Sequence, residues 1–180
     1  MAIGPVFAAV RPSQDAVLAV AARIGRLDIP GRLTPPENWH ITLRYLGRVE
    51  AVTFERFLHG LAEVGRVPAF RVALGGIGAF PNPRRATVIW IGVTEGDEGL
   101  ASLAGIAEES AVAAGLEPEE RPYRAHLTLA RVRPPADVTD LVGDPVPARW
   151  EVDRMIVYRS IPRGGAGVRY EPLESFDLAR

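Results

Sequence analysis

Two short segments of the chain share the pattern His-x-Thr-Leu, and their residue types are suited to acid–base chemistry. The first is His40-Ile41-Thr42-Leu43 and the second is His126-Leu127-Thr128-Leu129. The chain contains three histidines, and two of them occupy this pattern. Because imidazole titrates near pH ~6.5, one histidine can remove a proton at neutral pH while the other donates one. Threonine hydroxyls can donate hydrogen bonds to phosphate oxygens and stabilise developing charge. The pair of segments therefore suits phosphodiester cleavage without a metal.

Both segments lie within runs of β-prone residues, which predict strands over 39–46 and 124–132. Side chains alternate between the two faces of a strand, so each His shares a face with its Thr. The apolar residues between and after them, such as Ile41 and Leu43, point to the opposite face. If both strands border one cleft, two imidazoles and two hydroxyls meet around one small space.

The composition excludes several classes of chemistry. The chain has 180 residues with 47% hydrophobic and 24% charged residues, which is typical of a globular protein. It contains no cysteine, and all 21 basic residues are arginine, so thiolate metal sites, a Cys nucleophile and lysine Schiff-base chemistry are excluded. The net charge of −1 does not indicate a long nucleic-acid footprint. No apolar run approaches the roughly 20 residues of a membrane helix, so we expect a cytoplasmic protein without membrane association.

The remaining patterns predict the elements that position the two segments. Apolar periodicity predicts three helices, and β-prone runs separated by Gly and Pro predict about seven strands. The predicted helices are 13–27, 51–64 and 98–114, and the predicted strands are 3–10, 39–46, 70–74, 86–93, 124–132, 149–159 and 170–178. The glycine-rich segment 75–83 is predicted to be a loop, as is 133–148 apart from one helical turn near 138–142.

The order of these elements repeats along the chain. A helix and a proline-containing loop precede each of the strands 39–46 and 124–132, which suggests two related lobes that each contribute one strand to a shared cleft. We therefore expect a single α+β domain over 1–180, mostly antiparallel, with helices on the outer faces around a central cleft.

With these segments in view, nearly the whole chain resembles the two-histidine (2H) phosphoesterases, and within them the RNA 2′,3′-cyclic phosphodiesterases once described as 2′-5′ RNA ligases. The resemblance rests on the residues Pro36–Gly47, Gly78–Asn82, Tyr123–Arg131, and Arg159-Ser160 followed by Tyr170-Glu171. It implies two pseudo-symmetric lobes around a cleft, in agreement with the repeated layout.

The resemblance also implies an activity, which is the metal-independent hydrolysis of a terminal RNA 2′,3′-cyclic phosphate to a 2′-phosphate. His40 would protonate the departing 3′ oxygen and His126 would activate water, while Thr42 and Thr128 would hold the phosphate. No cofactor and no metal are expected. The implied partners are RNA 3′ ends or small nucleotides with a cyclic phosphate, and we expect a monomer.

Two further residues receive roles from the resemblance. Arg131 would neutralise the phosphate, although strict alternation places Ala130, and not Arg131, on the face of Thr128. Phe80 would stack on a base, with a structural role in its turn as an equal alternative. The N-terminal segment Ile3–Phe7 lacks the basic residue that relatives often carry before this Phe, which suggests that one phosphate contact is missing.

Several alternatives stay open at this point. The same site could act on a 2′-5′ oligonucleotide, a cyclic nucleotide or an ADP-ribose cyclic phosphate, or the protein could bind RNA ends without catalysis. Energy-independent reversal of the hydrolysis is a further possibility. A zinc site at His40 and His126 lacks an evident third ligand, because Glu37 is the one carboxylate within four residues of either. His59 is expected on a solvated helix face.

Overall fold

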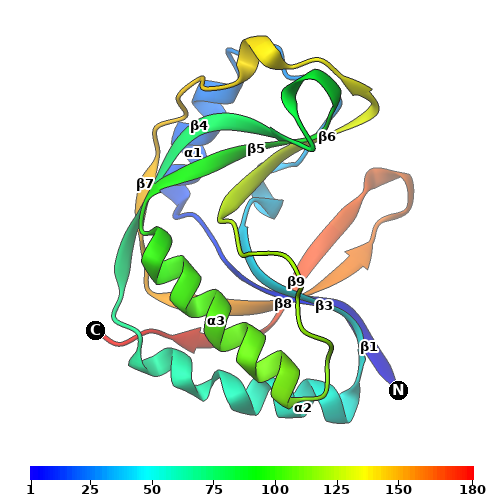
Figure 1. Ribbon diagram of the computed structural model, residues 1–180, viewed down its shortest axis with the longest axis vertical. Helices are drawn as coiled ribbons and strands as arrows, with labels where there is room; N and C mark the ends of the chain where they lie inside the picture. The colour runs from blue at the N-terminus through cyan, green and yellow to red at the C-terminus, as the bar shows by residue number, and fades with distance from the viewer.

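The computed structural model covers residues 1–180, all described except for the side chain of Ala166, and its strands form one curled sheet (Figure 1). The sheet order is β7-β4-β5-β6-β3-β1-β8-β9, with β2 paired to β6, and every pairing between these strands is antiparallel. The strands are β1 (Ala2–Val10), β2 (Arg32–Leu33), β3 (Ile41–Glu50), β4 (Phe70–Phe80), β5 (Ala86–Glu95), β6 (His126–Ala136), β7 (Arg149–Val152), β8 (Arg154–Pro162) and β9 (Val168–Asp177). The predicted α+β class is confirmed.

The sheet divides into two lobes where β3 meets β6. The first lobe contains β3, β1, β8 and β9, and the second lobe contains β6, β5, β4 and β7, with β2 on its edge. Neighbouring strands within each lobe pair over several residues, whereas β3 and β6 are joined at one pair, Ile41 and Leu127. The two strands that carry the His-x-Thr pattern are therefore the innermost strands of the two lobes.

Three helices cover the lobes, and two of them pack on the lobe that the other half of the chain forms. The helix α2 (Ala51–Gly60) packs on β1 and β3, while α3 (Asp97–Ala113) packs on β3 and beside α2 (Figure 1). The helix α1 (Gln14–Ile24) contacts β7, and the Ser13 hydroxyl caps it by accepting from the backbone N–H of Ala16. Thus α1, which follows a strand of the first lobe, covers the second lobe, and α3 does the reverse. This exchange interlocks the two halves of the chain.

The prediction that the glycine-rich segment is a loop was wrong, because β4 continues to Phe80. Gly78 pairs with Trp90 on β5, and a Cβ at Gly78 would lie 2.2 Å from the Trp90 ring. The glycine therefore makes room for a large cross-strand side chain and does not mark a turn. The turn follows at Pro83–Arg85, where the Asn82 side chain accepts hydrogen bonds from the backbone N–H groups of the next two arginines.

Two predicted boundaries in the second half were also wrong. The strand β6 continues through two prolines to Ala136, because it still pairs there with Ala86 of β5. The predicted strand 149–159 is two strands, β7 in the second lobe and β8 in the first, and the chain changes lobe at Asp153. The inward face shifts at this break, so Val152 and Met155 are both buried. The expected helical turn near 138–142 is present at Thr139–Leu141.

Apolar side chains of both lobes form one continuous core. A second, smaller cluster of Phe7, Ala9 and Tyr158 lies on the other face of β1 and β8, with Tyr170 packed against it. None of the helices in the described part of the chain combines the length and the hydropathy that crossing a membrane requires.

Candidate active site

The two His-x-Thr segments meet at the junction of the lobes. The pair of Ile41 with Leu127 sets the antiparallel register, which brings His40 opposite Thr128 and Thr42 opposite His126. Directly opposite side chains on one face of a sheet lie about 5 Å apart at the Cβ atoms. Each threonine is therefore a neighbour of the histidine from the other segment.

The alternation expected from the sequence holds on both sides of this junction. Ile41, Leu43, Leu127 and Leu129 are buried in the core. The histidines and threonines between them are half-buried on the opposite face. The core side chains thus fix the strands, and the four polar side chains share the face that borders the cleft.

Both imidazoles are held in the same way by the backbone. The Nδ1 atom of His40 lies 2.7 Å from the carbonyl oxygen of Asn38, and Nδ1 of His126 lies 2.7 Å from that of Arg124. Because a carbonyl oxygen accepts and does not donate, each Nδ1 carries the proton, and each Nε2 is left as the acceptor. The Nε2 of His40 accepts from the Thr42 hydroxyl at 3.0 Å.

The surroundings favour the neutral form of both histidines. Burial lowers the pKa of His40 to about 4, and the positive charges of Arg11, of Arg131 and of His126 when it is protonated act in the same direction. Burial also lowers the pKa of His126, with Arg124 and Arg131 contributing. With no anion bound, both rings are therefore neutral at pH 7, and an anion placed between them would raise both pKa values.

Arg131 lies near both histidines, and a β-bulge explains how it reaches them. The pairing between β5 and β6 shifts by one residue between Ala130 and Thr128, and Leu129 and Ala130 are both buried. The extra residue reverses the alternation, so Arg131 returns to the face of Thr128. The prediction that Ala130 shares this face was wrong, because alternation alone does not account for the bulge.

Aromatic rings enclose the two histidines on different sides. Phe7 and Tyr170 lie 4.9 and 5.2 Å from the His40 ring, measured between ring centroids. Phe80 and Trp90 lie 5.2 and 6.2 Å from the ring of His126. Aromatic side chains therefore cover part of each imidazole ring, which accounts for the burial that lowers its pKa.

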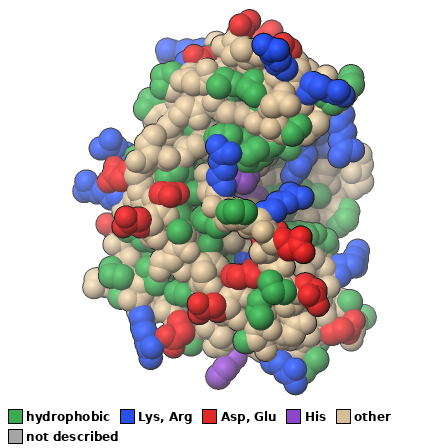
Figure 2. All heavy atoms as spheres, viewed as in Figure 1, with side chains coloured by type: hydrophobic (Ala, Val, Ile, Leu, Met, Phe, Trp, Pro, Cys, Tyr) green, Lys and Arg blue, Asp and Glu red, His purple; other side chains and the backbone are tan. Residues whose placement is uncertain are grey.

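A hollow of about 840 Å³ opens beside His126 and contains the residue expected to stack on a base. Phe80 lines this hollow, together with Thr42, Tyr123 and Arg124. The Arg124 guanidinium lies over the rings of Phe80 and Trp90, at 5.6 and 5.0 Å from their centroids. Figure 2 shows histidine inside a hollow near the centre of this face, with arginine side chains on both sides of the opening. An aromatic and cationic wall of this kind suits a planar ring that carries a negative group.

The third histidine takes no part in this site. His59 is exposed on α2, as expected. Among the described residues, no group of three or more His, Cys, Asp or Glu side chains is arranged to hold a metal ion.

Comparison with known proteins identifies the family. A family model for LigT-like phosphoesterases matches the chain twice, over residues 9–90 and 91–168, and each match contains one His-x-Thr segment. The chain belongs to the LigT-like phosphoesterase family. It is therefore a hydrolase of the 2H phosphoesterase type.

Relatives and solved structures agree with this assignment. The RNA 2′,3′-cyclic phosphodiesterase of Aeropyrum pernix is 34% identical over 119 residues, which cover 66% of this chain and 67% of the relative. That of Escherichia coli is 32% identical over 153 residues, 83% of this chain and 81% of the relative. A crystal structure of E. coli LigT complexed with 3′-AMP is 25% identical and superimposes with a TM-score of 0.84, covering 98% of this chain and 99% of that one.

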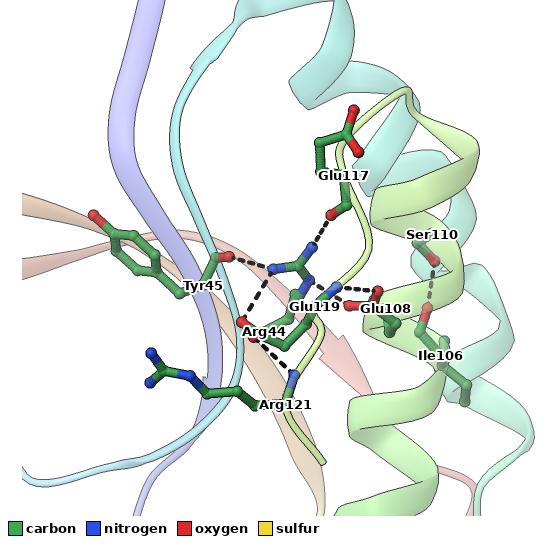
Figure 3. Close-up of polar contacts among 8 residues, drawn as sticks. All are labelled: Arg44, Tyr45, Ile106, Glu108, Ser110, Glu117, Glu119 and Arg121. Atoms are coloured by element: carbon green, nitrogen blue, oxygen red, sulfur yellow. Dashed lines mark hydrogen bonds and ion pairs between the residues drawn. The ribbon is translucent and has the colours of Figure 1, made fainter. Parts of the chain in front are cut away.

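In this LigT-like chain, Arg44 anchors the segment that leads to the second histidine. Its side chain is 11% exposed and its Nε lies 2.5 Å from the Glu108 carboxylate of α3 (Figure 3). The guanidinium also donates to the carbonyl oxygens of Tyr45 and Glu117, and Glu108 accepts from the backbone N–H of Glu119. Glu119 and residues 121–124 of this segment form one wall of the hollow beside His126. Arg44, two residues after Thr42, thus ties the first motif strand to the wall beside the second.

Sequence reasoning assigned no role to Arg44, Arg124 or Tyr170. Arg124 and Arg44 each lie within four residues of a motif histidine, so proximity in sequence could have drawn attention to them. Tyr170 lies 130 residues beyond His40 and reaches it because β9 is next to β8, which pairs with β1. A pairing of this kind leaves no local signal in the sequence.

Proposed function

We propose that this chain hydrolyses the 2′,3′-cyclic phosphate at the 3′ end of RNA to a 2′-phosphate by two-histidine acid–base catalysis without a metal. The observation that carries the proposal is the arrangement at the lobe junction, where two imidazoles, two threonine hydroxyls and the Arg131 guanidinium share one small region of the cleft. Relatives named RNA 2′,3′-cyclic phosphodiesterase support the substrate class.

In the proposed reaction, the Nε2 of His126 takes a proton from a water molecule as that water attacks phosphorus. The bond between phosphorus and the 3′ oxygen breaks, and His40 delivers a proton to that oxygen. A new phosphorus–oxygen bond to the water oxygen remains, which leaves a 2′-phosphomonoester. Since His40 is neutral in the free site, it acquires its proton when the anionic substrate raises its pKa.

The other polar groups stabilise the phosphate during this step. The Thr42 and Thr128 hydroxyls donate to the non-bridging oxygens, and Arg131 offsets the charge that builds on them. Phe80 stacks on the terminal base within the hollow beside His126, where Arg124 supplies positive charge. Stacking of a base on an aromatic side chain contributes roughly 1–3 kcal/mol and tolerates different sequences.

We also propose that the chain acts as a single bilobal domain, as a monomer and in the cytoplasm. The interlocking of the lobes through α1 and α3 supports a single domain, because each of these helices packs on the lobe formed by the other half of the chain. Light scattering at assay concentrations should give the mass of one chain, and a dimer mass would contradict the monomer.

An end-labelled RNA oligonucleotide with a 2′,3′-cyclic phosphate tests the proposed function. The product should be the 2′-phosphate and not the 3′-phosphate, and turnover should persist in EDTA. Dependence on added zinc would favour a metal mechanism, and tight binding without turnover would favour an RNA-end binder. Retention of full activity by the double variant His40→Ala/His126→Ala would overturn the two-histidine mechanism.

A further inference from the structure

A second cavity adjoins the histidine site on the side of β2 and the β8–β9 hairpin. Its volume is about 170 Å³, and Arg32, Asn38, Arg131, Val168 and Tyr170 are among the residues that line it. Tyr170 also lines the small cavity beside His40, and Arg131 is close enough to lower the pKa of both histidines. The second cavity therefore continues from the place proposed for the reacting phosphate.

Two arginines stand side by side in this cavity. Arg32 of β2 is the direct cross-strand partner of Arg131 of β6, so both side chains lie on one face of the sheet. Among the described residues, none of those that line the cavity is acidic. Neither guanidinium takes part in an ion pair within this part of the chain. Like charges directly opposite one another destabilise a sheet, whereas an anion that bridges them removes the repulsion.

The backbone around Arg32 leaves room for its guanidinium. Gly167 has φ +94°, and a Cβ there would lie 2.5 Å from an Nη atom of Arg32. The Asn38 side chain donates to the carbonyl oxygen of Val168 at 2.9 Å and so holds the start of β9 beside the segment before His40. Figure 1 shows the β8–β9 hairpin projecting from the first lobe. The cavity is therefore built jointly by the two lobes.

The chemistry of this cavity matches a phosphate group. Guanidinium groups bind phosphate oxygens through pairs of parallel N–H donors, and two adjacent guanidiniums can hold one phosphate between them. In an RNA strand the phosphodiester that precedes a terminal cyclic phosphate is one nucleotide away from it. We propose that Arg32 binds this preceding phosphate beside Arg131, which lies between it and the reacting phosphate, so that the enzyme selects oligonucleotides over single nucleosides that carry a cyclic phosphate.

This inference rests on the proposed function, and three substrates test the inference and the proposed function separately. A nucleoside 2′,3′-cyclic phosphate has no second phosphate and reports the reaction alone. A dinucleotide with the same end has one charged internal phosphodiester, and its methylphosphonate analogue has a neutral linkage of the same length. The wild type should turn over the charged dinucleotide with a higher kcat/KM than either of the other two.

The variant Arg32→Gln should lower kcat/KM on the charged dinucleotide roughly 10- to 100-fold, the usual effect of losing a charge-assisted hydrogen bond. Its kcat/KM on the nucleoside cyclic phosphate and on the methylphosphonate should stay unchanged. Arg32→Lys should retain part of the preference because it keeps the charge. Arg56→Gln, on the exposed face of α2, is the matched control and should behave as the wild type on all three substrates.

Binding of the dinucleotide 2′-phosphate, the expected product, provides a readout that needs no turnover. The slope of log Kd against log salt should decrease by about 0.7 in Arg32→Gln, as expected for one lost phosphate contact to a single strand. An equal loss on all substrates, or no loss on any, would overturn the inference while leaving the proposed function intact. Absence of turnover on every substrate would overturn the proposed function, and the salt slope would then decide the inference alone.

Discussion

The two lobes present the same His-x-Thr-Leu pattern in two different environments. Both histidines bind a carbonyl two residues earlier through Nδ1, but His40 is enclosed by Phe7 and Tyr170, while His126 faces the large hollow. Consequently the pKa of His40 falls to about 4, and that of His126 is lowered in a more open setting. The repeat thus supplies two similar side chains, and the packing around them makes their chemistry different.

The largest effects are expected from removing either histidine. His40→Ala and His126→Ala should each lower turnover of an RNA cyclic phosphate by roughly 10²–10⁴-fold, because each removes a positioned acid or base.

The pH profiles of kcat/KM for the two variants should differ in shape. Without the acid His40, activity should rise with pH and level off as His126 loses its proton. Without the base His126, activity should fall as His40 loses its proton. His59→Ala is the control, and exchanged profiles would reverse the two roles.

The burial of His40 should also make the folded state sensitive to acid. The pKa of His40 is lower in the folded chain than its ordinary value of 6.5. The contribution of the neutral ring to the free energy of unfolding is therefore fully present above pH 6.5 and is lost as the pH falls toward 4. The loss amounts to about 3 kcal/mol for a shift of this size. Urea unfolding between pH 7 and 4 should show this loss in the wild type and a smaller one in His40→Gln. Equal pH dependence in the two proteins would contradict the burial of a neutral His40.

The two threonines offer a finer comparison between the lobes. Thr42→Ala and Thr128→Ala should each weaken transition-state stabilisation by about 1–3 kcal/mol, measured from kcat/KM. The Thr42 hydroxyl donates to Nε2 of His40, a bond that favours the neutral ring. Thr42→Ala should therefore raise the pKa of His40 in an NMR titration, whereas Thr128→Ala should leave it in place. A rise in both variants would show that the threonines are equivalent.

The smallest effect on activity should come from the anchor between the lobes. Arg44→Met removes the ion pair with Glu108 and the contacts to the segment 117–124, so amide exchange in that segment should accelerate and KM should rise with little change in kcat. The free energy of unfolding should fall by about 1–3 kcal/mol. Arg66→Met breaks an exposed pair with Glu63 and should change stability by less than about 1 kcal/mol. Unchanged exchange in Arg44→Met would show that the segment does not depend on this arginine.

Much of the fold could be predicted because its signals are local. The predicted helices agree with α1, α2 and α3 to within a few residues at most ends, and the buried alternation of Ile41 and Leu43 follows the two-residue period of a strand. The strand through Gly78 could not be predicted, because the glycine is required by the bulk of Trp90 on the neighbouring strand. The division of the predicted strand 149–159 could not be predicted either, because β7 and β8 pair with strands of different lobes.

The sequence by itself determined the chemistry that the chain can offer, because residue types and the alternation of a strand put His and Thr on one face in each half. The tertiary structure decided how those groups differ and what surrounds them. The bulge that turns Arg131 toward the histidines, the burial of His40 and the meeting of Arg32 with Arg131 all depend on pairings between distant strands. Such pairings are set by packing over the whole sheet, and no local pattern of residues encodes them.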